Sequence, residues 1–159
     1  MFLNCILYLT AIGALSFVAG RLLPKSLFHH DRFPFRKLAF EHNGRLYERL
    51  CVRKWKDALP DMSKILPNIM LSKHLSPDLS APKLVRMIQE TCVAEWTHAL
   101  LCVLGFGCVL IWHGAFGWML AMLFALGNLP YIIIQRYNRP RLLRILHAIE
   151  KTEIKRSAS

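Results

Sequence analysis

The sequence predicts an all-α integral membrane protein with three transmembrane helices, and amphipathic interfacial helices in a cytoplasmic loop and a C-terminal tail. Two observations predict this class. Hydrophobic residues make up 54% of the 159 positions, yet the formal net charge is +11. A soluble domain spreads its charges over its whole surface, whereas a membrane protein concentrates basic residues on one side of the bilayer. At this length we expect a single membrane domain, residues 1–159.

The first apolar stretch covers about residues 2–23, which is long enough to cross the bilayer as a helix. A secretory signal peptide is the alternative interpretation. Against it, no Lys or Arg precedes the stretch, whereas Arg21 and Lys25 follow it directly. We therefore expect a retained membrane anchor.

Residues 24–92 form a basic loop whose prolines divide it into short pieces, so that a long helix is not expected there. Within the loop, Gly44 to Asp57 has Leu46 and Leu50 at helical spacing among basic side chains. This pattern predicts an amphipathic helix that lies on the membrane surface. Near the end of the loop, Pro82 occupies a position typical of the first turn of a helix, which would continue into the second span.

The second and third spans cover about residues 93–112 and 115–134, and a tight reversal at Gly114 joins them. The tail, residues 135–159, begins with a dense basic stretch. Apolar residues at 142–149 then predict a short surface helix.

The distribution of basic residues predicts the orientation. Fourteen of the 21 Lys and Arg residues lie between Arg21 and Arg86, and the other seven lie between Arg136 and Arg156. Under the positive-inside rule both segments are cytoplasmic, so the N-terminus is outside and the C-terminus inside a multi-pass protein of the cell membrane. Anionic lipids are the expected partner of the basic face. Nucleic acid is not, because the basic residues flank membrane spans.

Three ionisable groups at the cytoplasmic start of the second span are candidate catalytic residues: Glu90, Glu95 and His98. Such groups are costly in a membrane and indicate a functional site. His98 would act as a general base, and Glu95 or Glu90 would orient the imidazole and favour its charged form. The structural alternative is an ion pair of Glu95 with Arg136 and a histidine that only bonds a neighbouring helix.

The third span and its basic end should face this group, because a tight hairpin keeps its two helices antiparallel. Counting equal distances from the reversal places His98 level with about Leu129. The polar residues expected on this wall are Asn128, Gln135, Arg136, Tyr137, Asn138 and Arg139.

A set of cations is expected to hold a phosphate-bearing donor substrate, since arginine forks match phosphate oxygens. The set comprises Arg53, Lys54, Lys56, Arg136, Arg139 and Arg141, with Trp55 beside the donor's lipid part. The alternative is that these charges only anchor the protein to anionic lipid. His29, His30 and Asp31 could hold a metal ion, but no second cluster has ligand spacing, so no metal site and no bound cofactor are expected.

Three sequence segments resemble the glycosyl-4,4'-diaponeurosporenoate acyltransferases, small membrane enzymes of staphyloxanthin-type carotenoid biosynthesis. They are VRKWKD at residues 52–57, ET and AEWTH within residues 90–98, and QRYNRPRL at residues 135–142. Phe40, Glu41 and Gly44 and the pair His74 and Leu75 also fit, and the resemblance extends over about residues 23–146.

The resemblance implies an acyltransferase that moves a fatty acyl group to a sugar hydroxyl of a glycosylated carotenoid acid or a related glycolipid. The donor would be an activated thioester, either acyl-CoA or acyl carrier protein. The resemblance also makes His74 a second candidate base. The alternative function is a non-catalytic membrane adaptor that docks a pathway partner through its basic cytoplasmic face.

Small residues in the spans would serve close helix packing or a homo-oligomer.

Overall fold

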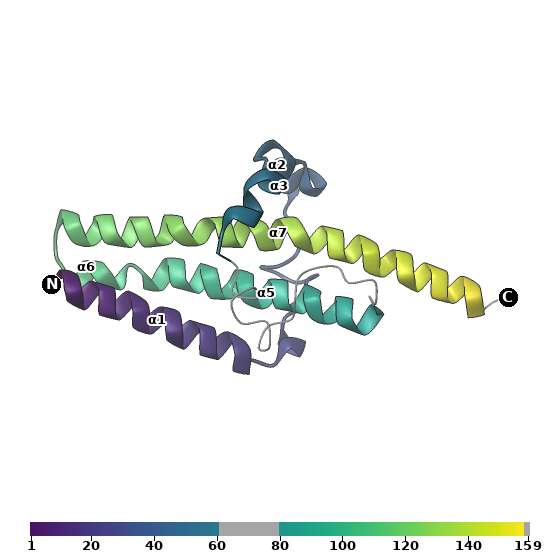
Figure 1. The fold of residues 1–159 in the computed structure, drawn as a ribbon, viewed down its shortest axis with the longest axis horizontal. Helices are drawn as coiled ribbons and strands as arrows, with labels where there is room; N and C mark the ends of the chain where they lie inside the picture. Colours follow the sequence, from purple (N-terminus) through teal and green to yellow (C-terminus); the bar gives the residue numbers. More distant parts are fainter. Residues whose placement is uncertain (61–79, 158–159) are drawn as a thin grey trace. The chain divides into compact units, whose positions relative to one another are not determined.

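Three long apolar helices carry the fold (Figure 1). The computed structural model describes residues 1–60 and 80–157, with residues 42–44 described by their backbone alone. The helices are α1 (Phe2–Leu22), α5 (Ala81–Leu104), which the short α6 (Gly107–Ile111) extends, and α7 (Ala115–Ser157). Their most apolar 18-residue windows have mean hydropathies of 2.0, 1.7 and 1.7. Since the described part of the chain contains no strand, the predicted all-α class with three spans is confirmed.

The chain divides into two compact units. The membrane unit comprises residues 1–24 and 93–135, and the basic unit comprises residues 25–92 and 136–159. Twenty of the 21 Lys and Arg residues belong to the basic unit, with Arg21 as the exception. Helices α5 and α7 contribute residues to both units.

In the membrane unit, α1 runs antiparallel to α5 and α6. The Tyr8 hydroxyl donates a hydrogen bond to the carbonyl of Leu104 (2.7 Å), and Cys5 packs against Cys108. Gly107 admits the Tyr8 ring, because a β-carbon at this position would collide with the ring. In its most apolar window only 11% of α1 is buried inside the protein, as expected of a helix that faces lipid.

The hairpin of the second and third spans forms as predicted, with one difference. Gly114 makes the reversal in a left-handed conformation (φ 97°), which glycine adopts without strain. The second span is interrupted, however, because Gly105 and Phe106 form a turn between α5 and α6. The Phe124 ring packs against Gly105 where a β-carbon would otherwise lie, so the break has a packing role.

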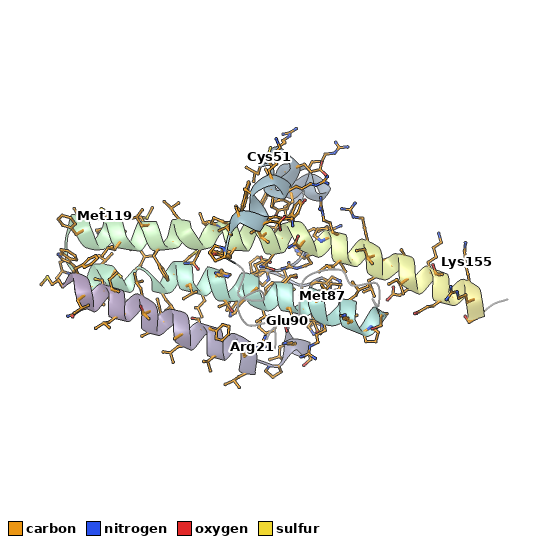
Figure 2. The ribbon with its side chains drawn as sticks, viewed as in Figure 1. Arg21, Cys51, Met87, Glu90, Met119 and Lys155 are labelled. Atoms are coloured by element: carbon orange, nitrogen blue, oxygen red, sulfur yellow. The ribbon has the colours of Figure 1, made fainter. Side chains whose placement is uncertain are left out.

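In the basic unit, the predicted amphipathic helix from Gly44 to Asp57 is wrong in extent. The chain instead forms η2 (Ala39–Gly44), α2 (Arg45–Arg49), α3 (Val52–Trp55) and η3 (Lys56–Ala58), after a first short turn, η1 (Lys25–Leu27). The break is at Cys51, labelled in Figure 2, whose φ of 50° is incompatible with a continuous helix.

The other two helix predictions for this region differ in outcome. Helix α5 begins at Ala81 and has Pro82 in its first turn, as predicted. The separate surface helix at 142–149 is wrong, because α7 continues without interruption to Ser157. In the basic unit, Leu142 and Leu146 of α7 pack with Leu84, Met87 and Ile88 of α5, so this part of α7 has a buried apolar partner.

Candidate active site

His98 is hydrogen-bonded across the hairpin to Asn128, one residue from the level of Leu129 that the count from the reversal predicted. His98 Nδ1 lies 2.9 Å from Asn128 Oδ1. The Asn128 amide group donates in turn to the carbonyl of Phe124, also at 2.9 Å. Because a carbonyl can only accept, the NH2 group must face Phe124 and the amide oxygen must face His98.

This arrangement selects one tautomer of the neutral imidazole. Asn128 Oδ1 is an acceptor, so His98 Nδ1 must carry the proton and Nε2 must carry the basic lone pair. Asn128 is 8% exposed, and its hydrogen bond is thus largely shielded from water. A histidine held at one nitrogen by a fixed acceptor is the usual arrangement of a general base.

The Tyr131 ring fixes the plane of the imidazole. The two rings are stacked with centroids 4.7 Å apart and planes 11° from parallel. His98 and Tyr131 are both partly exposed, so the imidazole is held in place but remains within reach of a substrate.

The two predicted carboxylates are placed differently. Glu95, one turn before His98 on α5, is 5% exposed and lies in the membrane unit. Glu90, labelled in Figure 2, forms an ion pair with Lys25 in the basic unit. The hydrogen-bond partner of His98 Nδ1 is Asn128. The orienting role of Glu95 or Glu90 therefore stays a prediction.

Gln135 continues the polar face of α7 that begins at Asn128. Asn128, Tyr131 and Gln135 are spaced by three and four residues and fall within about 60° of one another at 100° per residue. Gln135 is 3% exposed, and its Oε1 has no hydrogen-bond partner among the described residues. The sequence predicted that Gln135 would face the site, but it gave no sign that this oxygen would lack a partner within residues 1–60 and 80–157.

A buried carboxylate in the basic unit, Glu41, organises a cluster that the sequence argument did not assign. The Tyr47 hydroxyl donates to Glu41 Oε1, Arg136 Nε donates to the same oxygen (2.6 Å), and the Leu38 amide donates to Oε2 (2.9 Å). Burial raises the pKa of Glu41, but the hydrogen bonds from Tyr47, Arg136 and Leu38 outweigh it and leave the pKa below the usual 4.5. Burial, and then the bond to Glu41, raise the pKa of Tyr47 well above 10. The one available signal was that Phe40 and Glu41 fit the family pattern.

Two predicted phosphate-binding arginines have structural partners. Arg136 also donates to the carbonyls of Pro34 and Arg36 (both 3.2 Å). Arg139 is 4% exposed. It donates to the Phe35 carbonyl at 2.7 Å and to Thr91 Oγ1 at 2.9 Å. Within the basic unit these bonds tie residues 34–41 to α7, so binding of a phosphate by either residue stays a prediction.

The predicted donor-binding residue Arg141 remains on the surface and stacks on a buried tyrosine ring. Arg141 is exposed, and its guanidinium carbon lies 4.0 Å from the centroid of the Tyr137 ring. Tyr137 is buried, and its hydroxyl has no hydrogen-bond partner among the described residues.

The remaining predicted residues are given no shared site by the structure. Arg53 and Lys54 are exposed on α3, Trp55 and Asn138 are half-buried, and Lys56 pairs with Asp57 (2.8 Å). His74 lies outside the described residues. Across residues 1–60 and 80–157, no three His, Cys, Asp or Glu side chains gather in a way that could hold a metal ion.

A sequence profile of the family described as glycosyl-4,4'-diaponeurosporenoate acyltransferase matches residues 24–148. Relatives with that name from Staphylococcus aureus strains MRSA252, N315 and USA300 are each 33% identical over 138 residues, covering 83% of this chain and 79% of theirs. The chain belongs to this acyltransferase family. No solved structure matches it.

Family membership confirms the resemblance. It also confirms the predicted acyltransferase class and not the alternative function of a non-catalytic adaptor. The matched region contains both the His98–Asn128 pair and the Glu41 cluster. With three helices apolar and long enough to cross a bilayer, the protein is a multi-pass membrane acyltransferase of carotenoid biosynthesis.

Proposed function

We propose that this protein transfers a fatty acyl group from a thioester donor to a sugar hydroxyl of a glycosylated carotenoid acid or a related glycolipid, with His98 as general base. The observation that carries the proposal is the hydrogen bond of His98 Nδ1 to Asn128, which leaves the basic lone pair on Nε2. General-base catalysis by a positioned histidine contributes typically about 10²- to 10⁴-fold in rate.

The proposed reaction needs no redox step. His98 Nε2 takes the proton of the sugar hydroxyl while the hydroxyl oxygen attacks the thioester carbonyl. The carbon–sulfur bond of the tetrahedral intermediate then breaks. The leaving thiolate takes the proton back from the imidazolium, so that the products are an ester and a thiol and the histidine is neutral again.

The proposed donor is acyl-CoA or acyl carrier protein, both of which carry phosphate. The excess of cations in the basic unit supports a phosphate-bearing donor. Arg141 is the best-supported single contact, because stacking on Tyr137 restrains its exposed guanidinium and leaves the N–H groups at its edge available.

The proposed acceptor is lipid-borne, because His98 belongs to the membrane unit and lies in a helix apolar enough to span the bilayer. The family's named acceptor, a glycosylated diaponeurosporenoate, meets this requirement. The proposed orientation, with the N-terminus outside, places His98 at the cytoplasmic end of its span, where a cytoplasmic donor would arrive.

The test is acyl transfer by the purified protein in lipid nanodiscs, with labelled acyl-CoA and acyl carrier protein as alternative donors and glycosyl-4,4'-diaponeurosporenoate as acceptor. We expect His98→Ala to lower kcat at least about 100-fold. His147→Ala is the matched control, since His147 is exposed on α7, and it should retain wild-type kcat. Folded His98→Ala protein with wild-type kcat would refute the proposal. The donor that supports transfer by the wild-type protein identifies the thioester as acyl-CoA or acyl carrier protein.

A further inference from the structure

The buried oxygen of Gln135 indicates a missing hydrogen-bond donor. Gln135 Oε1 has almost no contact with solvent and no partner among the described residues. Leaving a buried acceptor unsatisfied costs the desolvation of that group without any return. A folded protein tolerates such a group at a site where a ligand supplies the partner.

Gln135 lies on the same face of α7 as the two residues that contact the proposed base. Gln135 lies four residues after Tyr131 and seven after Asn128 on one face of α7, about 6 and 10 Å along the helix axis. Tyr131 stacks on the His98 ring and Asn128 bonds it. All four residues belong to the membrane unit. A single sugar ring with its hydroxyl groups covers the shorter of these two distances, the one from Tyr131, on which the His98 ring is stacked.

The chemistry of the oxygen limits what can bind to it. A carboxamide oxygen only accepts, so the ligand must present a donor. A fatty acyl chain, a thioester group and a carotenoid polyene have none. A sugar has several hydroxyl groups besides the one that is acylated, and they are attached to the same ring as the reacting oxygen.

We propose that Gln135 is the sugar-binding residue of the acceptor site, with its Oε1 accepting a hydrogen bond from a hydroxyl of the acceptor sugar that is not acylated. This inference rests on the proposed function. The inference adds to the proposed function the residue that selects a glycosylated acceptor over a simple membrane alcohol. Water on Gln135, or an amide N–H of the donor's pantetheine arm, would be the competing partners.

The test compares acceptors with altered sugars. Steady-state kinetics are measured with glycosyl-4,4'-diaponeurosporenoate and with analogues that each lack one non-reacting sugar hydroxyl. We expect one analogue to raise the acceptor KM of the wild-type protein about tenfold, because that acceptor leaves the buried Gln135 oxygen unpaired. Gln135→Met should raise the KM for the parent acceptor about tenfold and show no further loss with that analogue, while kcat and the donor KM stay within about twofold.

Two further variants exclude a purely structural effect. Gln135→Glu keeps an acceptor oxygen and should still distinguish the analogue from the parent. Gln89→Met makes the same change at a half-buried glutamine in the basic unit, and it should leave all constants at wild-type values.

Three results would overturn the inference. The Gln135→Met protein could still show a higher KM for the analogue than for the parent acceptor, or it could show a raised KM for the donor in place of the acceptor. The wild-type protein could also show an equal rise in the acceptor KM with every analogue. Each of them leaves the proposed function intact, provided that wild-type protein transfers acyl groups and His98→Ala does not. A wild-type protein without transfer activity would overturn both.

Discussion

Replacing Asn128 by leucine should disable the base and leave the base residue itself in place. Leucine has nearly the shape of asparagine but offers no acceptor to His98 Nδ1, 2.9 Å away. The imidazole can then place its proton on either nitrogen, and the tautomer with the proton on Nε2 cannot accept a proton there.

The expected loss follows from the value of the hydrogen bond. A buried N–H group that loses its acceptor costs roughly 1–3 kcal/mol. If that cost shifts the tautomer equilibrium away from the active form, the active fraction falls by about 5- to 150-fold, at roughly 1.4 kcal/mol per factor of ten. We therefore expect kcat to fall within that range while the KM values of both substrates change little, because Asn128 orients the base and does not bind substrate.

The assay is steady-state acyl transfer in nanodiscs, with thermal unfolding measured on the same preparations. Asn128→Asp keeps an oxygen acceptor facing His98 and should retain more activity than Asn128→Leu. Cys102→Ala is the matched control, because Cys102 makes only a weak contact across the same hairpin, from its sulfur to the Ala125 carbonyl (3.5 Å). Folded Asn128→Leu protein with kcat within threefold of wild type would refute the tautomer argument.

Four further outcomes are expected. Arg139→Met should lower the free energy of unfolding by about 2–4 kcal/mol in a detergent melt, because it leaves buried oxygens without a donor, and a melt equal to wild type would contradict this role. Glu41→Gln should lower stability at pH 7. Since the pKa of Glu41 is lowered in the folded protein, this difference should be fully present above pH 4.5 and shrink as the pH falls below it; a constant difference would refute the assignment. Gly107→Ala should destabilise the protein by about 1–3 kcal/mol through collision with a tyrosine ring of α1. The matched control for that change is Gly127→Ala, which has open space around the new methyl group and should be neutral or slightly stabilising. A reporter inserted at Gly114 should be external, and a cytoplasmic signal would reverse the proposed orientation.

The hairpin shows how far sequence reasoning extends to the site. Counting from the reversal at Gly114 predicted that His98 would lie level with about Leu129, and its hydrogen bond to Asn128, one residue away, agrees with that level. The count works because both helices rise by the same distance per residue. It could not predict which atom of His98 would be held, since that depends on the rotation of each helix about its axis and on the bond from Asn128 to the Phe124 carbonyl.

The Glu41 cluster shows where the same reasoning ends. Its members come from positions 38, 41, 47 and 136, and the predicted secondary structure of residues 44–57 was wrong. A hydrogen bond between residues about 95 positions apart has no periodic signal in the sequence. Arg136 therefore looked like an available cation in the sequence, whereas the structure gives it a buried carboxylate partner.

The sequence alone determined the three apolar spans, the reversal between the last two, the start of α5 and the concentration of charge in one part of the chain. These features follow from local terms: the hydropathy of a window, the backbone limits of proline and glycine, and the count of Lys and Arg. Only the tertiary structure decided that α7 continues to Ser157, that Asn128 holds Nδ1 of His98, and that Gln135 buries an oxygen with no partner in the part of the chain that the structure describes. These features depend on which side chains from distant segments meet in a packed interior, where each buried polar atom requires a specific partner.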